Sequence, residues 1–208
     1  MRRACRLSAR TMSDVERFTS PPPEELDAAQ REVYNAIVDG PRAAETSRTP
    51  TTDADGALLG PFATMLLAPG TGMAVQRLGG AIRFAGTLSA AAREAAILAV
   101  AAAERSDFEW FAHEQAAVAA GVAPGDVAAI RGGGEPADPE LAAVCRATRA
   151  LHADGALDDA AFAETVDAVG REGLAELVWL TGYYAMLATS LRVFDPPVPP
   201  AARGIFAD

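Results

Sequence analysis

The segment AAREAAILAVAAA, residues 91–103, constrains the fold of this chain more than any other stretch. Its length and alanine content favour a helix, and its apolar residues face every direction instead of one side. Such a helix is stable only when other elements cover it on all sides. We therefore expect a domain in which further helices pack around this segment.

Helical patterns precede and follow this segment, and no strand-like alternation of apolar and polar residues competes with them. The sequence predicts an all-α, single-domain bundle of about eight helices. The longer helices are expected at 23–39, 70–86, 89–103, 106–120, 138–153, 158–170 and 173–194. We divide the chain into a disordered or extended leader (1–22), a helical domain (23–195) and a Pro-rich tail (196–208). The long polar loop 41–59 is a candidate lid.

Composition excludes several classes of function. The formal net charge of −10 disfavours binding to nucleic acid and to anionic membranes. All 18 basic residues are arginine, so chemistry that needs a lysine, such as a pyridoxal phosphate Schiff base or a P-loop, is excluded. The two cysteines, Cys5 and Cys145, form no CxxC pair, and we expect a reduced, cytoplasmic protein with no structural zinc.

Three ionisable residues form the main candidate site. Glu94 lies in the apolar helix, and Glu109 and His113 lie one turn apart on the next helix. A short turn makes the two helices antiparallel neighbours, which can bring Glu94 beside the pair. A histidine flanked by carboxylates can act as a general acid and base near neutral pH. The alternative is structural: Ser106 and Glu109 fit a capping box, and His113 is then a core residue.

The stretch LSAAAREAAILAVAAAERSDFEWFAHEQAAVAAGV resembles the carboxymuconolactone decarboxylase family, which includes alkylhydroperoxidase D. Thiol members of that family carry a glutamate followed by C-x-x-C-x-x-x-H. On the pattern of the family, Glu94 takes the place of the upstream glutamate and His113 that of the histidine. Ser106 and Glu109 stand where the two cysteines would be. The resemblance extends over roughly residues 60–195 and implies an alkylhydroperoxidase D-like helical fold.

The missing cysteine pair argues against thiol-dependent peroxide reduction, which needs both thiols. The resemblance instead points to the decarboxylase branch, whose chemistry is cofactor-free and metal-free proton transfer on a small lactone acid or keto acid. It assigns catalysis to His113, Glu109 and Glu94, and it implies a homo-oligomer, a trimer or hexamer. A peroxidase-related protein without the cysteine pair and a non-catalytic ligand-binding oligomer are the alternatives. The candidate substrate-binding residues are Arg83, Ser106, Trp110 and Tyr183.

Overall fold

The computed structural model describes residues 17–40 and 49–207, and over these residues the chain is all-α, as predicted. Residues 1–16 of the predicted leader and 41–48 of the predicted loop lie outside the described ranges. The eight α-helices are α1 (Ala28–Val38), α2 (Gly60–Thr64), α3 (Pro69–Phe84), α4 (Ala90–Ala103), α5 (Asp107–Ala119), α6 (Pro124–Arg131), α7 (Pro139–Asp154) and α8 (Asp159–Phe194). Short 3-10 turns are η1 (Pro23–Glu25), η3 (Met65–Leu67) and η4 (Pro200–Ala202).

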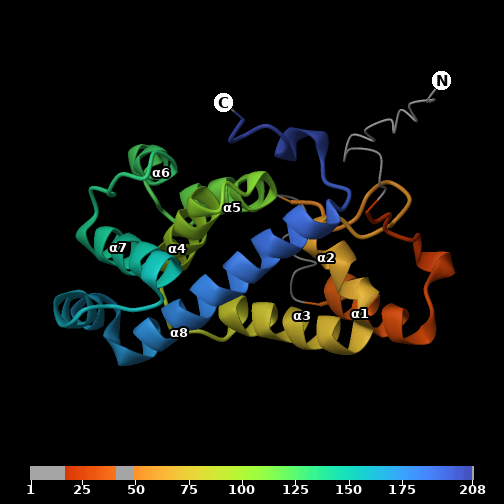
Figure 1. Cartoon of the computed structure of the whole chain (residues 1–208), viewed down its shortest axis with the longest axis horizontal. Coiled ribbons are helices and arrows are strands. Elements are labelled where there is room, and N and C mark those ends of the chain that lie inside the picture. Colours follow the sequence, from red (N-terminus) through yellow and green to blue (C-terminus); the bar gives the residue numbers. More distant parts are fainter. Residues whose placement is uncertain (1–16, 41–48, 208) are drawn as a thin grey trace, which may run out of the picture.

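Helix α4 is the centre of the domain, which confirms the expectation drawn from its composition. It packs against α5, α6, α7 and α8 (Figure 1). Every residue from Glu94 to Ala101 is buried. The long helix α8 runs diagonally across the molecule, with α4–α7 on one side and α1–α3 on the other (Figure 1). This arrangement allows side chains from α3, α4, α5 and α8 to meet.

The helix boundaries follow local capping chemistry. The side chain of Ser89 accepts a hydrogen bond from the backbone of Ala92 at the start of α4, as its sequence predicts. The first helix was expected from residue 23, but α1 begins only at Ala28. Asp27 and Gln30 form a reciprocal capping box there, and the prolines before it make only the 3-10 turn η1.

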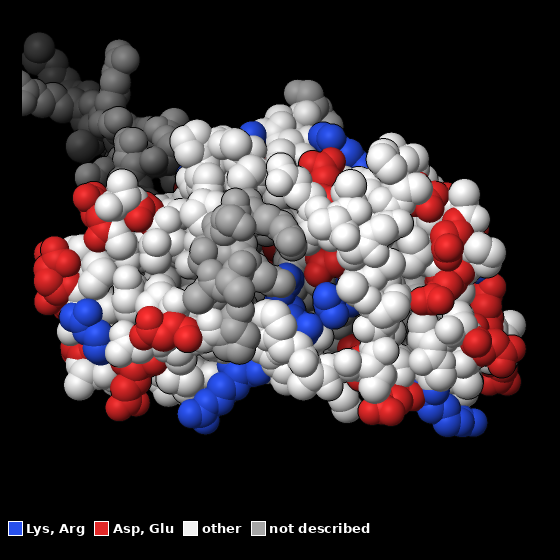
Figure 2. Space-filling model, turned by 180° about the vertical axis from the view of Figure 1, so that it is seen from behind, with Lys and Arg blue, Asp and Glu red and all other residues white. Residues whose placement is uncertain are grey.

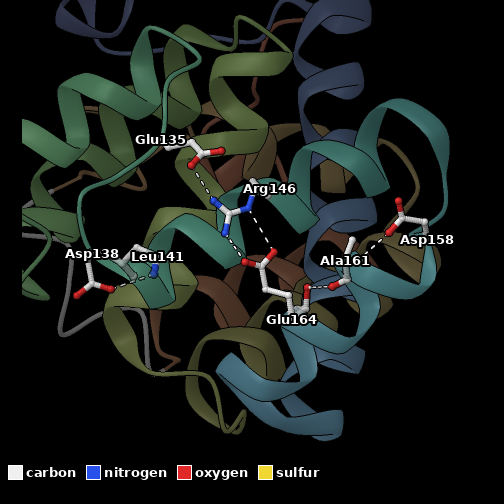
Figure 3. Close-up of polar contacts among 8 residues, drawn as sticks. Glu135, Asp138, Leu141, Arg146, Asp158, Ala161 and Glu164 are labelled. Carbon is white, nitrogen blue, oxygen red and sulfur yellow. Dashed lines mark hydrogen bonds and ion pairs between the residues drawn. The ribbon is translucent and has the colours of Figure 1, made fainter.

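The two last predicted helices, 158–170 and 173–194, are both present: α8 consists of two helical stretches that are separated by a kink at Gly170. Gly170 has φ of 74° and ψ of 170°, a backbone conformation that only glycine adopts without strain. Arg146 of α7 lies between Glu135 and Glu164 of α8, and it forms an ion pair with each (Figure 3). The same view shows the N-caps Asp138 and Asp158, whose carboxylates accept hydrogen bonds from backbone N–H groups of α7 and α8. The exposed ion pairs of Arg146 add little to stability, whereas the two N-caps fix the starts of α7 and α8.

The C-terminal segment lies against the N-terminal half of α5. The Asp107 carboxylate accepts hydrogen bonds from the backbone N–H groups of Gly204 and Phe206. The Phe206 ring packs edge-on against Trp110, with ring centroids 5.6 Å apart. The predicted tail therefore covers part of the helical domain. None of the described helices is long and apolar enough to cross a membrane.

Candidate active site

The site is built on the hairpin formed by α4 and α5. Only three residues connect the two helices, and Arg105 takes a left-handed conformation with φ of 50° to make the reversal. The backbone N–H of Ser106 donates to the carbonyl of Ala101 and closes the turn. A connection this short makes the helices antiparallel neighbours, so Glu94 on α4 faces α5, as the sequence predicts.

Glu94 and His113 are in direct contact. The Glu94 Oε2 and His113 Nδ1 atoms are 2.6 Å apart, and both side chains are buried. Arg83 of α3 lies beside the pair, with its Nη1 3.7 Å from Glu94 Oε1 and 3.5 Å from His113 Nδ1. Arg93 Nε is 3.6 Å from Glu94 Oε1. The glutamate thus holds the histidine ring in one orientation and is itself surrounded by cations.

These neighbours determine the charge of Glu94. Burial opposes its ionisation, but His113 and then Arg83 and Arg93 favour the charged form and together hold the pKa of Glu94 below its usual value. Glu94 is therefore a buried carboxylate at neutral pH, paired with an imidazole. This is the arrangement by which a carboxylate orients a histidine for proton transfer.

Glu109 has a different environment. Its side chain is 2% exposed, and neither carboxyl oxygen makes a hydrogen bond of normal geometry with the described residues. Burial raises its pKa well above the usual value; the Ser106 hydroxyl and Arg192 oppose this, and Glu104 adds to it. Burial therefore favours the neutral, protonated form of Glu109 in the folded protein.

This geometry corrects two expectations for Glu109. Ser106 occupies the N-cap of α5, but its side chain makes no capping hydrogen bond, so the predicted capping box is not formed. Glu109 also does not hydrogen-bond to His113, whose Nδ1 pairs with Glu94 instead. Glu109 and His113 are four residues apart and share a helix face, but His113 forms its hydrogen bond with the Glu94 carboxylate on the neighbouring helix.

Glu109 and His113 both line a cavity of about 90 Å³, which has room for several water molecules at roughly 10–15 Å³ each. The other polar residues in its wall are Thr49, Thr51, Arg83, Tyr183 and Tyr184. The apolar part consists of Pro61, Phe62, Phe108, Ala112, Ala116 and Leu187. Seen from behind, the molecule has a hollow near the middle of this face, in which both basic and acidic side chains are visible (Figure 2). A mostly apolar cavity with a few polar groups is typical of a small-molecule site.

The predicted substrate-binding residues separate into two groups. Arg83 and Tyr183 lie in the cavity wall, whereas Trp110 and Ser106 do not. Trp110 is fully buried under Phe206, with the Arg131 guanidinium over its ring. Ser106 lines a separate, shallower depression beside the C-terminal segment. For Trp110, helical spacing could have indicated this, because it follows Glu109 directly and consecutive residues on a helix point about 100° apart.

Tyr184 was not among the predicted site residues, although it packs edge-on against His113 with ring centroids 5.2 Å apart. Burial raises the pKa of its hydroxyl, so Tyr184 remains a neutral phenol. The nearby Arg83 opposes this shift in pKa without outweighing burial. The adjacent ring of Tyr183 packs against the Tyr184 ring at 5.3 Å. The sequence alone does not indicate which of the two adjacent tyrosines, Tyr183 or Tyr184, faces the histidine.

The other candidates from the sequence lie elsewhere. His152 pairs with Glu104, with the Nε2 and Oε1 atoms 2.7 Å apart, and it is not part of the cavity. Cys145 is buried, and burial raises the pKa of its thiol to about 11. Within the described part of the chain, no three histidine, cysteine or acidic side chains converge as metal ligands do.

Comparison with known proteins agrees with this architecture. Residues 69–154 match the model of the carboxymuconolactone decarboxylase family. A solved structure described as an alkylhydroperoxidase AhpD core, an uncharacterized peroxidase-related protein from Ralstonia eutropha JMP134, superposes with a TM-score of 0.69. The alignment covers 89% of this chain and 93% of that one at 15% sequence identity, which shows a common fold. Among proteins with curated descriptions, none matches this chain.

The matched residues 69–154 contain α3, α4 and α5, and with them Arg83, Glu94, Glu109 and His113. The match to the family model therefore covers these four ionisable groups, whereas the parts of α2 and α8 that line the cavity lie outside it. This segment is therefore similar to the carboxymuconolactone decarboxylase family, and the chain has an alkylhydroperoxidase D-like helical fold.

Proposed function

We propose that this protein is a cofactor-free acid–base enzyme that acts on a small lactone acid or keto acid by proton transfer, in a decarboxylation or an isomerisation. The observation that carries the proposal is the contact of 2.6 Å between Glu94 and His113 at the wall of a cavity that also contains Glu109. The similarity of residues 69–154 to a family named for a decarboxylase supports the same class of reaction.

The proposed roles follow from the geometry. Glu94 holds Nδ1 of His113, so proton exchange with a ligand takes place at Nε2. In an isomerisation, His113 removes a proton from the carbon next to a carbonyl group and returns it at another carbon. In a decarboxylation, the carbon–carbon bond to the carboxylate breaks and carbon dioxide leaves, while the electron pair moves onto the carbonyl oxygen. Protonated His113 then donates its proton to the carbon and regains a proton from water.

The test is turnover of lactone and keto acids by three variants. We expect His113→Ala, Glu94→Gln and Glu109→Gln each to reduce turnover, the first by about 10²- to 10⁴-fold, because a general acid–base group supplies that much. Glu172→Gln, a change of an exposed carboxylate on α8, is the control and should leave turnover unchanged. Full turnover in all three site variants would refute the mechanism.

A peroxidase-related function is the second candidate, because the solved structure of similar fold carries that description. Cys145 does not support it, since its thiol is buried and its pKa is raised to about 11, which leaves almost no thiolate at neutral pH. A hydroperoxide assay with a dithiol reductant decides between the two. Robust turnover of hydroperoxide would favour the peroxidase-related function over ours.

We also propose a homo-oligomer, a trimer or hexamer, in the cytoplasm. Its support is the outer side of α8, where Val178, Trp179, Met186 and Val193 are exposed, with Trp179 at 60%. A series of exposed apolar side chains on one helix is unusual for a monomer. Light scattering after size-exclusion chromatography, with Trp179→Glu as the disrupting variant, tests this. A monomeric wild-type protein would contradict it.

A further inference from the structure

Glu109 and Arg83 come from different helices, α5 and α3, and both lie in the wall of the same cavity. Arg83 contacts both Glu94 and His113, and its side chain is 13% exposed. Glu109 makes no hydrogen bond to Arg83 or to His113. The cavity therefore has a positively charged side and a side that carries an unpaired, buried carboxyl group.

A buried carboxyl group without a hydrogen-bond partner is costly in either protonation state, so its place in a cavity wall requires an explanation. The charged groups that act on Glu109 are Glu104, which opposes its ionisation, and Arg192, which favours it. These two are already paired with each other, with Arg192 Nη1 and Glu104 Oε2 2.5 Å apart. Their effects therefore largely cancel, and burial decides the state of Glu109.

We propose that the cavity binds a small, singly charged keto acid or lactone acid, whose carboxylate faces Arg83 and whose carbonyl oxygen accepts a hydrogen bond from Glu109 in its neutral, protonated form. The ligand supplies the partner that Glu109 lacks. This inference rests on the proposed function for the reaction that follows binding, but the binding itself is a separate claim.

The two environments assign the acid and the base. His113 removes the proton from the carbon next to the carbonyl, and the electron pair of that C–H bond forms a carbon–carbon double bond. The π electrons of the carbonyl group move to its oxygen, which takes the proton of Glu109. Glu109 becomes a carboxylate and His113 an imidazolium, so charge is balanced, and the reverse transfers restore both groups. Two ionisable groups held in opposite states are typical of such acid–base pairs.

Charge limits the ligand to one carboxylate. Among the described residues of the wall, Arg83 is the fixed cation, and His113 pairs with the Glu94 carboxylate. A second carboxylate on the ligand would have no cation of its own, because Arg83 is the one lysine or arginine among the described residues that line the cavity. Dicarboxylic acids should therefore bind more weakly than monocarboxylic acids of the same chain length.

The first experiment tests the protonation state without any ligand. Infrared difference spectra of the wild-type full chain and Glu109→Gln, recorded at neutral pH, should show the carbonyl stretch of a protonated carboxylic acid in the wild type that is lost in the variant. Glu94→Gln is the matched control and should retain that band, because Glu94 is ionised. Loss of carboxylate bands in Glu109→Gln, with no acid band, would overturn the proposal.

The second experiment measures binding by calorimetry with three four-carbon probes: 2-oxobutanoate, butanoate and succinate. We expect 2-oxobutanoate to bind about tenfold more tightly than butanoate, the upper part of the range for one hydrogen bond, and succinate to bind most weakly. Glu109→Leu should remove the preference for the keto acid, whereas Glu109→Gln, which keeps an N–H donor, should retain most of it. Arg83→Met should weaken both monocarboxylates.

Equal binding of 2-oxobutanoate and butanoate, tighter binding of succinate, or no binding of any probe would each overturn the inference. If Glu109→Leu does not fold, the comparison of the three probes on the wild-type protein still decides. The two proposals fail in different ways. Binding in the expected order without turnover of any keto or lactone acid would contradict the proposed function alone, and turnover without this order of binding would contradict the ligand class alone.

Discussion

Replacement of Glu109 by glutamine should make the protein more stable at neutral pH, and the gain should depend on pH in a defined direction. In the unfolded chain this carboxyl group ionises near its ordinary pKa of 4.5, whereas burial raises the pKa in the folded protein well above that. Between the two values the folded state binds the proton that the unfolded state releases. The stability of the wild type therefore falls as pH rises through this window.

The magnitude follows from linkage. Each pH unit inside the window costs about 1.4 kcal/mol, so from pH 4.5 to about pH 6.5 the wild type loses at most about 2.7 kcal/mol from this group. Glutamine does not titrate, so the variant should show none of this loss. Below pH 4.5 the wild-type side chain is neutral in both states, and the advantage of the variant should disappear.

Urea unfolding followed by circular dichroism, at about pH 4.5, 5.5 and 6.5, measures the effect. With a slope of about 2–3 kcal/mol per molar urea, the full difference corresponds to roughly 1 M in the midpoint. Glu172→Gln, on the exposed side of α8, is the control and should follow the wild type. A Glu109→Gln variant that is less stable than the wild type at neutral pH, or equally stable at every pH, would refute the reasoning.

Three further predictions concern packing and charge. Gly60→Ala should reduce the free energy of unfolding by at least about 2 kcal/mol, because Gly60 has φ of 57° and a Cβ would lie 2.5 Å from the Phe108 ring. Gly182→Ala is the matched change, and it should raise the free energy of unfolding by up to about 1 kcal/mol, because a Cβ there would have nothing within 4 Å. Equal melting temperatures of the two variants would contradict this prediction. Cys145 should resist alkylation by iodoacetamide until urea unfolds the protein, and rapid labelling of the native protein, mapped by mass spectrometry, would show that its burial is wrong. Glu94→Gln should lower the free energy of unfolding, measured in urea, by about 3 kcal/mol, because it leaves the buried cations around Glu94 without their carboxylate. A decrease of less than about 1 kcal/mol would contradict the ion-pair network.

Much of the fold could be predicted from local sequence. The apolar composition of 91–103 required a central, surrounded helix, and α4 is that helix. Helical periodicity located the other long helices, with errors at the ends. The first helix begins at Ala28 instead of residue 23, because Asp27 provides a better cap than the prolines before it. Capping depends on which side chain reaches a backbone N–H, and several residues in one segment can compete for that position.

The candidate site could be predicted only in part. The short connection after α4 was sufficient to bring Glu94 to His113, since it allows only an antiparallel hairpin. The relation of Glu109 to these residues was left open between a cap and a partner for His113, and the structure shows neither. Spacing along one helix shows which residues share a face. It does not show which of two carboxylates, one on the same helix and one on its neighbour, lies nearer to the cations.

The sequence by itself determined the central buried helix, the hairpin and the presence of two carboxyl groups near one histidine, because helix periodicity and loop length are local properties of the chain. Only the tertiary structure decided that these carboxyl groups differ in charge. Arg83, brought by α3, and Arg93 keep Glu94 ionised, whereas Glu109 is enclosed without a cation bonded to it. The pKa of a buried acid depends on its distance to charges on other elements and on its access to water, and both are set when the helices pack.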